Sequence, residues 1–144
     1  KNGGMGMLKP GDELQITIRD YEKKDFESIQ QLNAQEGWTN LVEQSEHTEK
    51  AWECSAIAYV AENEDQQVIG YIRGLTDGFV SMYICELLVE APFRGLRIGK
   101  KLLDFAHSRH PHTRLELLAS ASSSSFYEKH AFRSFYGFRK TFSE

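Results

Sequence analysis

A glycine-bearing turn between an apolar strand and a basic helix is the segment best suited to chemistry. It lies in Glu86–Leu103, which reads E-L-L-V-E-A-P-F-R-G-L-R-I-G-K-K-L-L. Backbone N–H groups at a helix start carry partial positive charge and bind phosphate oxygens, and glycines such as Gly95 and Gly99 let a ligand approach the main chain. The segment therefore predicts a seat for a pyrophosphate, unless the glycines serve only the backbone geometry of the turn.

Other kinds of site find less support in the sequence. The turn lacks the Gly-Lys-Ser/Thr ending of a P-loop, and the dinucleotide pattern Gly-x-Gly-x-x-Gly is absent. His107, His110 and His112 flank a proline at a spacing that matches no familiar zinc pattern, so no metal is predicted. The serine run Ser122–Ser125 lacks a Gly-x-Ser-x-Gly elbow, so we interpret it as a loop and helix cap.

The elements that position the turn begin with an alternating strand, Leu14–Arg19. A helix follows, because apolar residues recur at helical spacing at Phe26, Ile29 and Leu32. Asp20 or Asp25 is expected to cap it. The charged stretch Leu41–Cys54 indicates either a second, more exposed helix or a mobile loop.

The middle of the chain is rich in strand-forming residues. Ala56–Ala61 and Gln67–Leu75 predict an antiparallel hairpin with a polar turn. Thr76–Phe79 supplies the next turn, in which Asp77 serves the turn rather than a substrate. Val80–Val89 is apolar enough to be covered on both faces, so we expect it at the centre of the sheet.

The last third continues the same alternation of elements. Gly99–Ser108 predicts an amphipathic helix, Arg114–Leu118 a short strand and Ser122–His130 a brief helix. Phe132–Phe142, divided by Gly137, indicates a terminal pair of strands.

Two segments in this order resemble a known family. Arg94–Gly99 (R-G-L-R-I-G) fills the pattern Arg/Gln-x-x-Gly-x-Gly/Ala at both ends, after an apolar strand, and Phe126–Phe132 (F-Y-E-K-H-A-F) resembles F-Y-E-K-x-G-F. The chain from Ile16 to about Lys140 thus resembles the GNAT (Gcn5-related) N-acetyltransferase superfamily. The resemblance implies an α/β (α+β) fold with a mixed, mostly antiparallel sheet, splayed at the central strand, and helices on both faces.

The resemblance also implies how acetyl-CoA, the expected cosubstrate, would bind. Main-chain groups of Leu87, Leu88 and Val89 would pair with the pantetheine arm, and one N–H there would polarise the thioester carbonyl. The pyrophosphate would lie on the turn made by Arg94, Gly95, Leu96, Arg97, Ile98, Gly99 and Lys100. Arg97 stands where the family usually has its middle glycine. Either its side-chain cation lies near the phosphate in place of one close approach of the main chain, or the loop is shifted. Ser120 stands where many members have an Asn, and Ala131 replaces a glycine.

Two residues are the candidates for proton transfer. By resemblance, Tyr127 would protonate the departing CoA thiolate, for which a phenol is a suitable donor; the alternative is an aromatic ring packed between helix and sheet. Glu86 is the candidate base for the acceptor amine, because an ionisable residue on a buried strand is costly unless it is paired or faces a cleft. The alternative is an ordinary ion-paired glutamate.

The distribution of charge along the chain indicates which cofactor and substrate the protein could bind. The net charge is −4, yet residues 91–144 hold 10 Lys and Arg against 4 Asp and Glu. Either surface charges cluster without function, or an anionic cofactor binds beside an acidic approach for a cationic substrate. We expect an N-acetyltransferase acting by direct attack on an amine of a small molecule or peptide. The alternatives are a catalytically inactive CoA-binding regulatory domain and a nucleic-acid-binding module. The negative net charge argues against a nucleic acid as partner.

The remaining expectations concern organisation and location. We expect residues 1–7 to be a leader or cloning remnant and residues 8–144 to form one domain, whose C-terminal edge strand could pair in a homodimer. No run of 18 apolar residues and no secretory signal is apparent, so no membrane contact and a cytoplasmic location are expected. Cys54 and Cys85 are expected to be reduced thiols.

Overall fold

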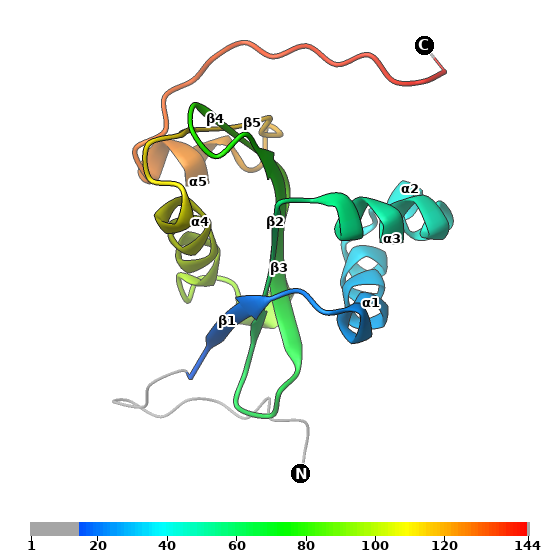
Figure 1. The fold of residues 1–144 in the computed structure, drawn as a ribbon. Coiled ribbons are helices and arrows are strands. Elements are labelled where there is room, and N and C mark those ends of the chain that lie inside the picture. The colour runs from blue at the N-terminus through cyan, green and yellow to red at the C-terminus, as the bar shows by residue number, and fades with distance from the viewer. Residues whose placement is uncertain (1–14, 144) are drawn as a thin grey trace.

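The computed structural model describes residues 15–143. A sheet forms the middle layer, with helices on both of its faces (Figure 1). The strands are β1 (Thr17–Asp20), β2 (Ile57–Glu62), β3 (Val68–Thr76), β4 (Ser81–Val89) and β5 (Arg114–Leu117). The helices are η1 (Lys23–Asp25), α1 (Phe26–Glu36), α2 (Thr39–Glu43), α3 (Ser45–Cys54), η2 (Ala91–Phe93), α4 (Ile98–Arg109) and α5 (Ser124–Lys129). The expected leader and Leu14 of the expected first strand lie outside the described residues.

The sheet is mixed and mostly antiparallel, as expected. Its strand order is β1-β2-β3-β4-β5, and only β4 and β5 run parallel. The prediction that Val80–Val89 forms the centre of the sheet is wrong, because β3 is the middle strand and β4 is the fourth. Ile69–Ile72 of β3 are all buried, whereas Cys85–Leu87 of β4 are only half-buried. The apolar run in β4 therefore does not mark the centre of the sheet, because part of this strand borders a cleft.

A bulge in β4, in its pairing with β3, lies where the pairing of β4 with β5 ends. The pairs Arg73↔Glu86 and Gly74↔Ile84 leave Cys85 as an extra residue on β4. Bulges bend a strand and increase its twist. Pairing between β4 and β5 ends at Ile84↔Leu117, immediately before the bulge, so the two strands diverge beyond this point. This divergence is the splay that the family resemblance implied.

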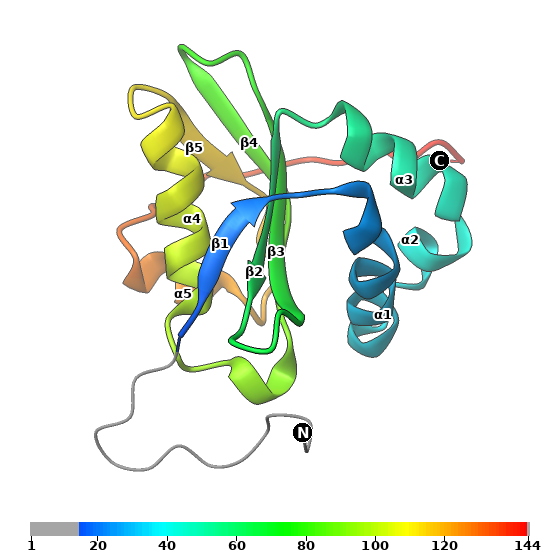
Figure 2. The ribbon, with the colours of Figure 1, turned by 60° about the horizontal axis from the view of Figure 1, so that its bottom comes forward.

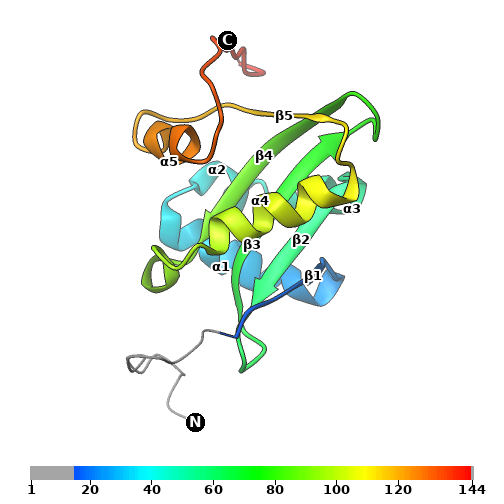
Figure 3. The same cartoon turned by 90° about the vertical axis from the view of Figure 1, so that its left-hand side faces the viewer.

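Each face of the sheet has its own apolar core. Figure 2 shows α1, α2 and α3 on one face and α4 with α5 on the other. On the α1 side, Trp52 packs edge-on against Tyr71, whose hydroxyl donates a hydrogen bond to the buried amide of Asn33. On the α4 side, Leu102 and Ile98 pack against the strands, and Figure 3 shows α4 lying across that face. The stretch Leu41–Cys54, left open between helix and loop, is helical for most of its length.

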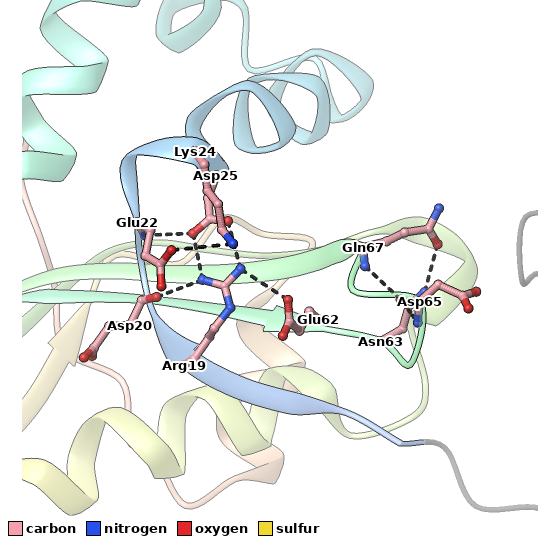
Figure 4. Close-up of polar contacts among 9 residues, drawn as sticks. All are labelled: Arg19, Asp20, Glu22, Lys24, Asp25, Glu62, Asn63, Asp65 and Gln67. Atoms are coloured by element: carbon pink, nitrogen blue, oxygen red, sulfur yellow. Dashed lines mark hydrogen bonds and ion pairs between the residues drawn. The ribbon is translucent and has the colours of Figure 1, made fainter.

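An ion-pair network fastens the first strand to the first long helix (Figure 4). The guanidinium of Arg19 donates to both carboxylate oxygens of Asp25, at 2.8 and 2.9 Å, and to Glu62 at 3.2 Å. Asp25 also accepts the backbone N–H of Glu22 at 2.8 Å. Asp25 is the N-cap residue of α1, but its side chain binds no helix N–H, so the expected side-chain cap is replaced by this network. Nearby, Asn63 accepts the N–H groups of Asp65 and Gln67 in the β2–β3 turn.

The expected terminal pair of strands is wrong. After α5, Phe132–Phe142 forms no strand, and Phe135, Tyr136 and Phe138 are 77%, 99% and 95% exposed. A strand needs a hydrogen-bonded neighbour, and this segment pairs with none of the five strands of the sheet. Figures 1 and 3 show the segment extending away from the helices and the sheet.

Candidate active site

The cleft lies where β4 and β5 diverge and has a volume of about 370 Å³. One wall comes from β4 and contains Glu86, Leu87, Leu88 and Val89. The remaining lining residues include Glu36, Trp38, Arg94, Leu117, Leu118, Ser120, Ser122, Ser123 and Tyr127. The structure thus brings seven predicted site residues to one cavity from four separate parts of the chain. A larger hollow of about 540 Å³, beside Tyr21 and Arg109, contains none of the predicted residues.

The remaining predicted residues form the turn between β4 and α4. Gly95 has φ +82°, and a Cβ built there would meet no atom within 4 Å, so the turn is open at this point. The α4 hydrogen bonds begin with the N–H of Lys101 donating to Arg97 at 3.0 Å. The N–H groups of Ile98, Gly99 and Lys100 therefore precede the intrahelical ladder, as those of a helix start do. These three N–H groups are suited to donate hydrogen bonds to a phosphate.

The backbone of Arg97 and the packing of Gly99 both differ from what the sequence alone suggests. Arg97 has φ +66°, in the left-handed region that glycine adopts at no steric cost, so its backbone follows a path that the usual glycine would also allow. Gly99 has a packing role that the sequence did not indicate, because a Cβ there would lie 3.3 Å from the ring of Phe126. Ile98 directs its side chain into the core, where it is 1% exposed, so only its main chain can serve a ligand.

Tyr127 both packs in the core and borders the cleft. Its ring makes edge contacts with Phe126 and Phe132, at centroid distances of 5.0 and 5.4 Å. Burial raises the pKa of Tyr127 above its ordinary value. The phenol is therefore protonated at neutral pH and able to donate a proton. The packing interpretation of Tyr127 is confirmed, and its role as a proton donor stays a prediction.

Glu86 is half of a partly buried ion pair. Arg73 donates to its two carboxylate oxygens at 2.6 and 2.7 Å, and the two side chains are only 14% and 16% exposed. Burial alone would lower the pKa of Arg73, but the bond to Glu86 raises it, so the guanidinium stays charged. Arg73 also donates to Ser55 at 3.1 Å. A carboxylate has about four lone-pair positions, so the pair leaves acceptor capacity for a water or an amine.

Cys85, the bulged residue, lies in the same cleft. Burial raises the pKa of its thiol, and the carboxylate of Glu86 opposes ionisation, whereas Arg73 acts in the other direction. The thiolate is the nucleophilic form of cysteine. A thiol that stays protonated is a poor nucleophile.

The serines before α5 shape the loop rather than the helix. Ser123 is the N-cap residue, but its hydroxyl accepts the N–H of Ser120 at 3.1 Å and caps no N–H of α5. The expected loop is confirmed, and the expected side-chain cap is wrong. Asp77, in turn, accepts the N–H groups of Phe79, Val80 and Ser81, which confirms its turn role. No cluster of three or more metal-ligating side chains occurs within residues 15–143.

Sequence reasoning missed Glu36, Trp38 and Arg73. Glu36 and Trp38 flank Gly37, whose φ of +84° ends α1. A glycine directly after a helical pattern is a C-cap signal and could have placed both residues at a helix end. No sequence signal pairs Arg73 with Glu86, because that contact depends on the strand register.

Comparison with known proteins agrees with this fold. A family model described as an acetyltransferase (GNAT) domain matches residues 54–134, more than half of the chain. The chain therefore belongs to the GNAT acetyltransferase family, for which acetyl-CoA is the general cosubstrate. No curated protein matches the chain significantly.

Solved structures share the fold over most of the chain. A GNAT family acetyltransferase of Streptococcus pneumoniae is 25% identical, with a TM-score of 0.75 over 92% of this chain and 100% of that one. Glucosamine-6-phosphate N-acetyltransferase of Arabidopsis thaliana is 18% identical, with a TM-score of 0.65 over 89% and 99%. Ard1 of Thermoplasma volcanium is 23% identical, with a TM-score of 0.62 over 82% of each chain. Between residues 15 and 143, no helix has the length and apolar character needed to cross a membrane.

Proposed function

We propose that the protein transfers the acetyl group of acetyl-CoA to an amine of a small molecule or peptide by direct attack. The observation that carries the proposal is the cleft beside the Cys85 bulge, which is lined by Leu87–Val89, by Tyr127 and by Arg94 of the turn before α4. The alternative, a catalytically inactive CoA-binding domain, is not favoured, because the family match is to an acetyltransferase domain.

The open turn and the helix start are suited to hold the cosubstrate. The N–H groups of Ile98, Gly99 and Lys100 would bind the pyrophosphate, with the cations of Arg97 and Lys100 nearby. Main-chain groups of Leu87–Val89 would pair with the pantetheine arm, because β4 has no β5 partner beyond Ile84. When bound, acetyl-CoA supplies an activated thioester carbonyl at this strand.

The reaction then needs two proton transfers. As the amine nitrogen bonds to the carbonyl carbon, its proton leaves to Glu86 directly or through a water. An N–H of Leu87–Val89 stabilises the charge that develops on the carbonyl oxygen. When the C–S bond breaks, Tyr127 donates its proton to the thiolate and regains one from Glu86 through solvent. The protons therefore balance, and the products are the amide and free CoA.

A screen of primary amines tests the proposal. With acetyl-CoA present, the release of free thiol should depend on the amine and match the amide formed, as measured by mass spectrometry. An acetylated protein that forms without amine would instead indicate a covalent intermediate. Failure of every amine to release thiol, in a protein that binds CoA, would favour the inactive domain.

We also propose that the protein forms a homodimer and lies in the cytoplasm. The exposed aromatic segment after α5 carries Arg133, Arg139 and Lys140, whereas α2 and α3 carry four glutamates. This complementarity supports a homodimer in which the segment of one copy covers the other, and light scattering before and after truncation at Phe132 would measure it. Free thiols at Cys54 and Cys85 suit the reducing cytoplasm.

A further inference from the structure

The C-terminal end of α1 forms one wall of the cleft. The N–H of Gly37 donates to Ala34 at 3.1 Å and the N–H of Trp38 donates to Asn33 at 2.9 Å, which is the pattern of a Schellman motif. The motif stops the helix at Glu36 and turns the chain so that Trp38 follows immediately. Glu36 and Trp38 both line the cleft. Their position is therefore fixed by the backbone of the cap.

This corner is chemically suited to a cation. The Glu36 carboxylate supplies a negative charge, and the carbonyl end of α1 adds the negative end of the helix dipole. The indole of Trp38 is the aromatic ring that attracts cations most strongly. The other cleft-lining carboxylate that the structure describes, Glu86, is already neutralised by Arg73. Glu36 is ion-paired as well, with Arg94, but its side chain is 32% exposed against 16% for Glu86, so an incoming positive charge can reach Glu36 more readily.

A cation already occupies the corner. The guanidinium of Arg94 donates to the Glu36 carboxylate, and its Nε donates to the carbonyl of Val89 at 2.8 Å. The Arg94 side chain is 48% exposed and that of Glu36 is 32% exposed. Ion pairs this exposed are screened by solvent and contribute little to stability, so another cation can displace Arg94 at small cost.

Arg94 also has a second destination. It begins the turn proposed to hold the pyrophosphate, and a guanidinium binds phosphate through two parallel hydrogen bonds. If Arg94 turns to the phosphate, the carboxylate of Glu36 loses its partner beside the bound thioester. The corner is then open to a positive charge on the acceptor.

We propose that Glu36 and Trp38 form a subsite for a second positive charge on the acceptor, so that the substrate class is a diamine, a polyamine or a peptide with a basic residue. The inference rests on the proposed acetyl transfer and specifies its acceptor. One amine is acetylated in its neutral form near Leu87–Val89. The other remains a cation against Glu36.

Matched substrates test the subsite. Wild-type kcat/KM for 1,4-diaminobutane should exceed that for n-butylamine by about tenfold or more, which corresponds to about 1.4 kcal/mol. In Glu36→Gln, this preference should fall to about twofold or less, with most of the change in KM for the diamine. Glu43→Gln is the matched control, because Glu43 ends the neighbouring helix α2 and does not line the cleft. It should keep the wild-type preference.

The outcomes separate the subsite from the reaction. Turnover with an equal diamine preference in wild type and Glu36→Gln would overturn the subsite and leave acetyl transfer intact. If no amine is acetylated, calorimetric titration of 1,4-diaminobutane into the protein saturated with CoA decides the matter. Binding that Glu36→Gln weakens about tenfold supports the subsite, and equal or absent binding in both proteins overturns it.

Discussion

The phenol of Tyr127 is held in an environment that keeps its proton in place until a strong base appears. Its ring packs between Phe126 and Phe132, and burial raises its pKa. In the proposed reaction the phenol would donate this proton to the sulfur as the C–S bond breaks. In the proposed mechanism, the aromatic packing would fix the position of the proton donor.

Removal of this hydroxyl gives the first prediction. Tyr127→Phe keeps the ring and its contacts, so the melting temperature should be nearly unchanged and CoA should bind as before. The kcat should fall by about ten- to ten-thousandfold, the range for loss of a general acid. Steady-state thiol release and thermal unfolding measure the two effects. Unchanged turnover would remove Tyr127 from the mechanism.

Prediction at the residue scale succeeded where a motif fixes position. Leu87–Val89, Arg94, Ser120 and Tyr127 line one cleft, as the resemblance implied. It missed Arg73, because the partner of Glu86 depends on a strand register that a bulge shifts by one residue. It missed Glu36 as well, because the ion pair with Arg94 joins residues that are distant in the sequence.

The bulge in β4 is the element on which the cleft depends. Gly74 faces it across the pairing, and a Cβ at Gly74 would lie 2.6 Å from the carbonyl oxygen of Tyr83. Backbone atoms in two paired strands cannot move apart cheaply. The glycine therefore permits the close approach of β3 and β4 beside the bulge.

Substitution of Gly74 gives the second prediction. Gly74→Ala should lower the free energy of unfolding by about 1–3 kcal/mol, the usual cost of overpacking, and should also reduce acetyl transfer by shifting β4. Chemical denaturation and thiol release measure both effects. Gly95→Ala is the contrasting variant, since it meets no neighbour and should cost only about 1–2 kcal/mol from its positive φ. Equal activity of Gly74→Ala and wild type would show that the bulge tolerates displacement.

Periodicity in the sequence predicted most elements but not their order in space. The helices at Phe26–Glu36 and Ile98–Arg109 and the β2–β3 hairpin follow directly from apolar spacing. The segment Phe132–Phe142 has strand-forming residues, but such residues form a strand only where an edge accepts them. Propensity alone cannot supply that partner.

At the scale of the whole molecule, an ion-pair network joins the first strand to the helical layer. Burial alone would raise the pKa of Asp25, but the hydrogen bonds from Arg19 and from the backbone of Glu22 lower it below the ordinary value. A carboxyl group with a lowered folded-state pKa stabilises the fold above its unfolded pKa of about 3.9. That contribution is lost as the pH falls through the folded-state value.

Neutralisation of this network gives the third prediction. Asp25→Asn should lower the free energy of unfolding at pH 7 by about 1–3 kcal/mol, because the charge-assisted bonds to Arg19 are lost. The difference from wild type should shrink as the pH falls below about 3.9 and the wild-type carboxyl group takes up its proton. Urea denaturation at several pH values measures this. Asp20→Asn, which alters an exposed neighbour, should change little, and a pH-independent difference for Asp25→Asn would contradict the account.

The central claim is that the turn Arg94–Lys100 and the exposed edge of β4 hold coenzyme A, and isothermal titration calorimetry tests it most directly. We predict a saturable heat with one CoA bound per chain and an affinity that weakens as the salt concentration rises. Pantetheine, which lacks the phosphates of CoA, should bind more weakly. No heat with either CoA or acetyl-CoA at protein concentrations of tens of micromolar, or equal binding of pantetheine and CoA, would contradict the claim.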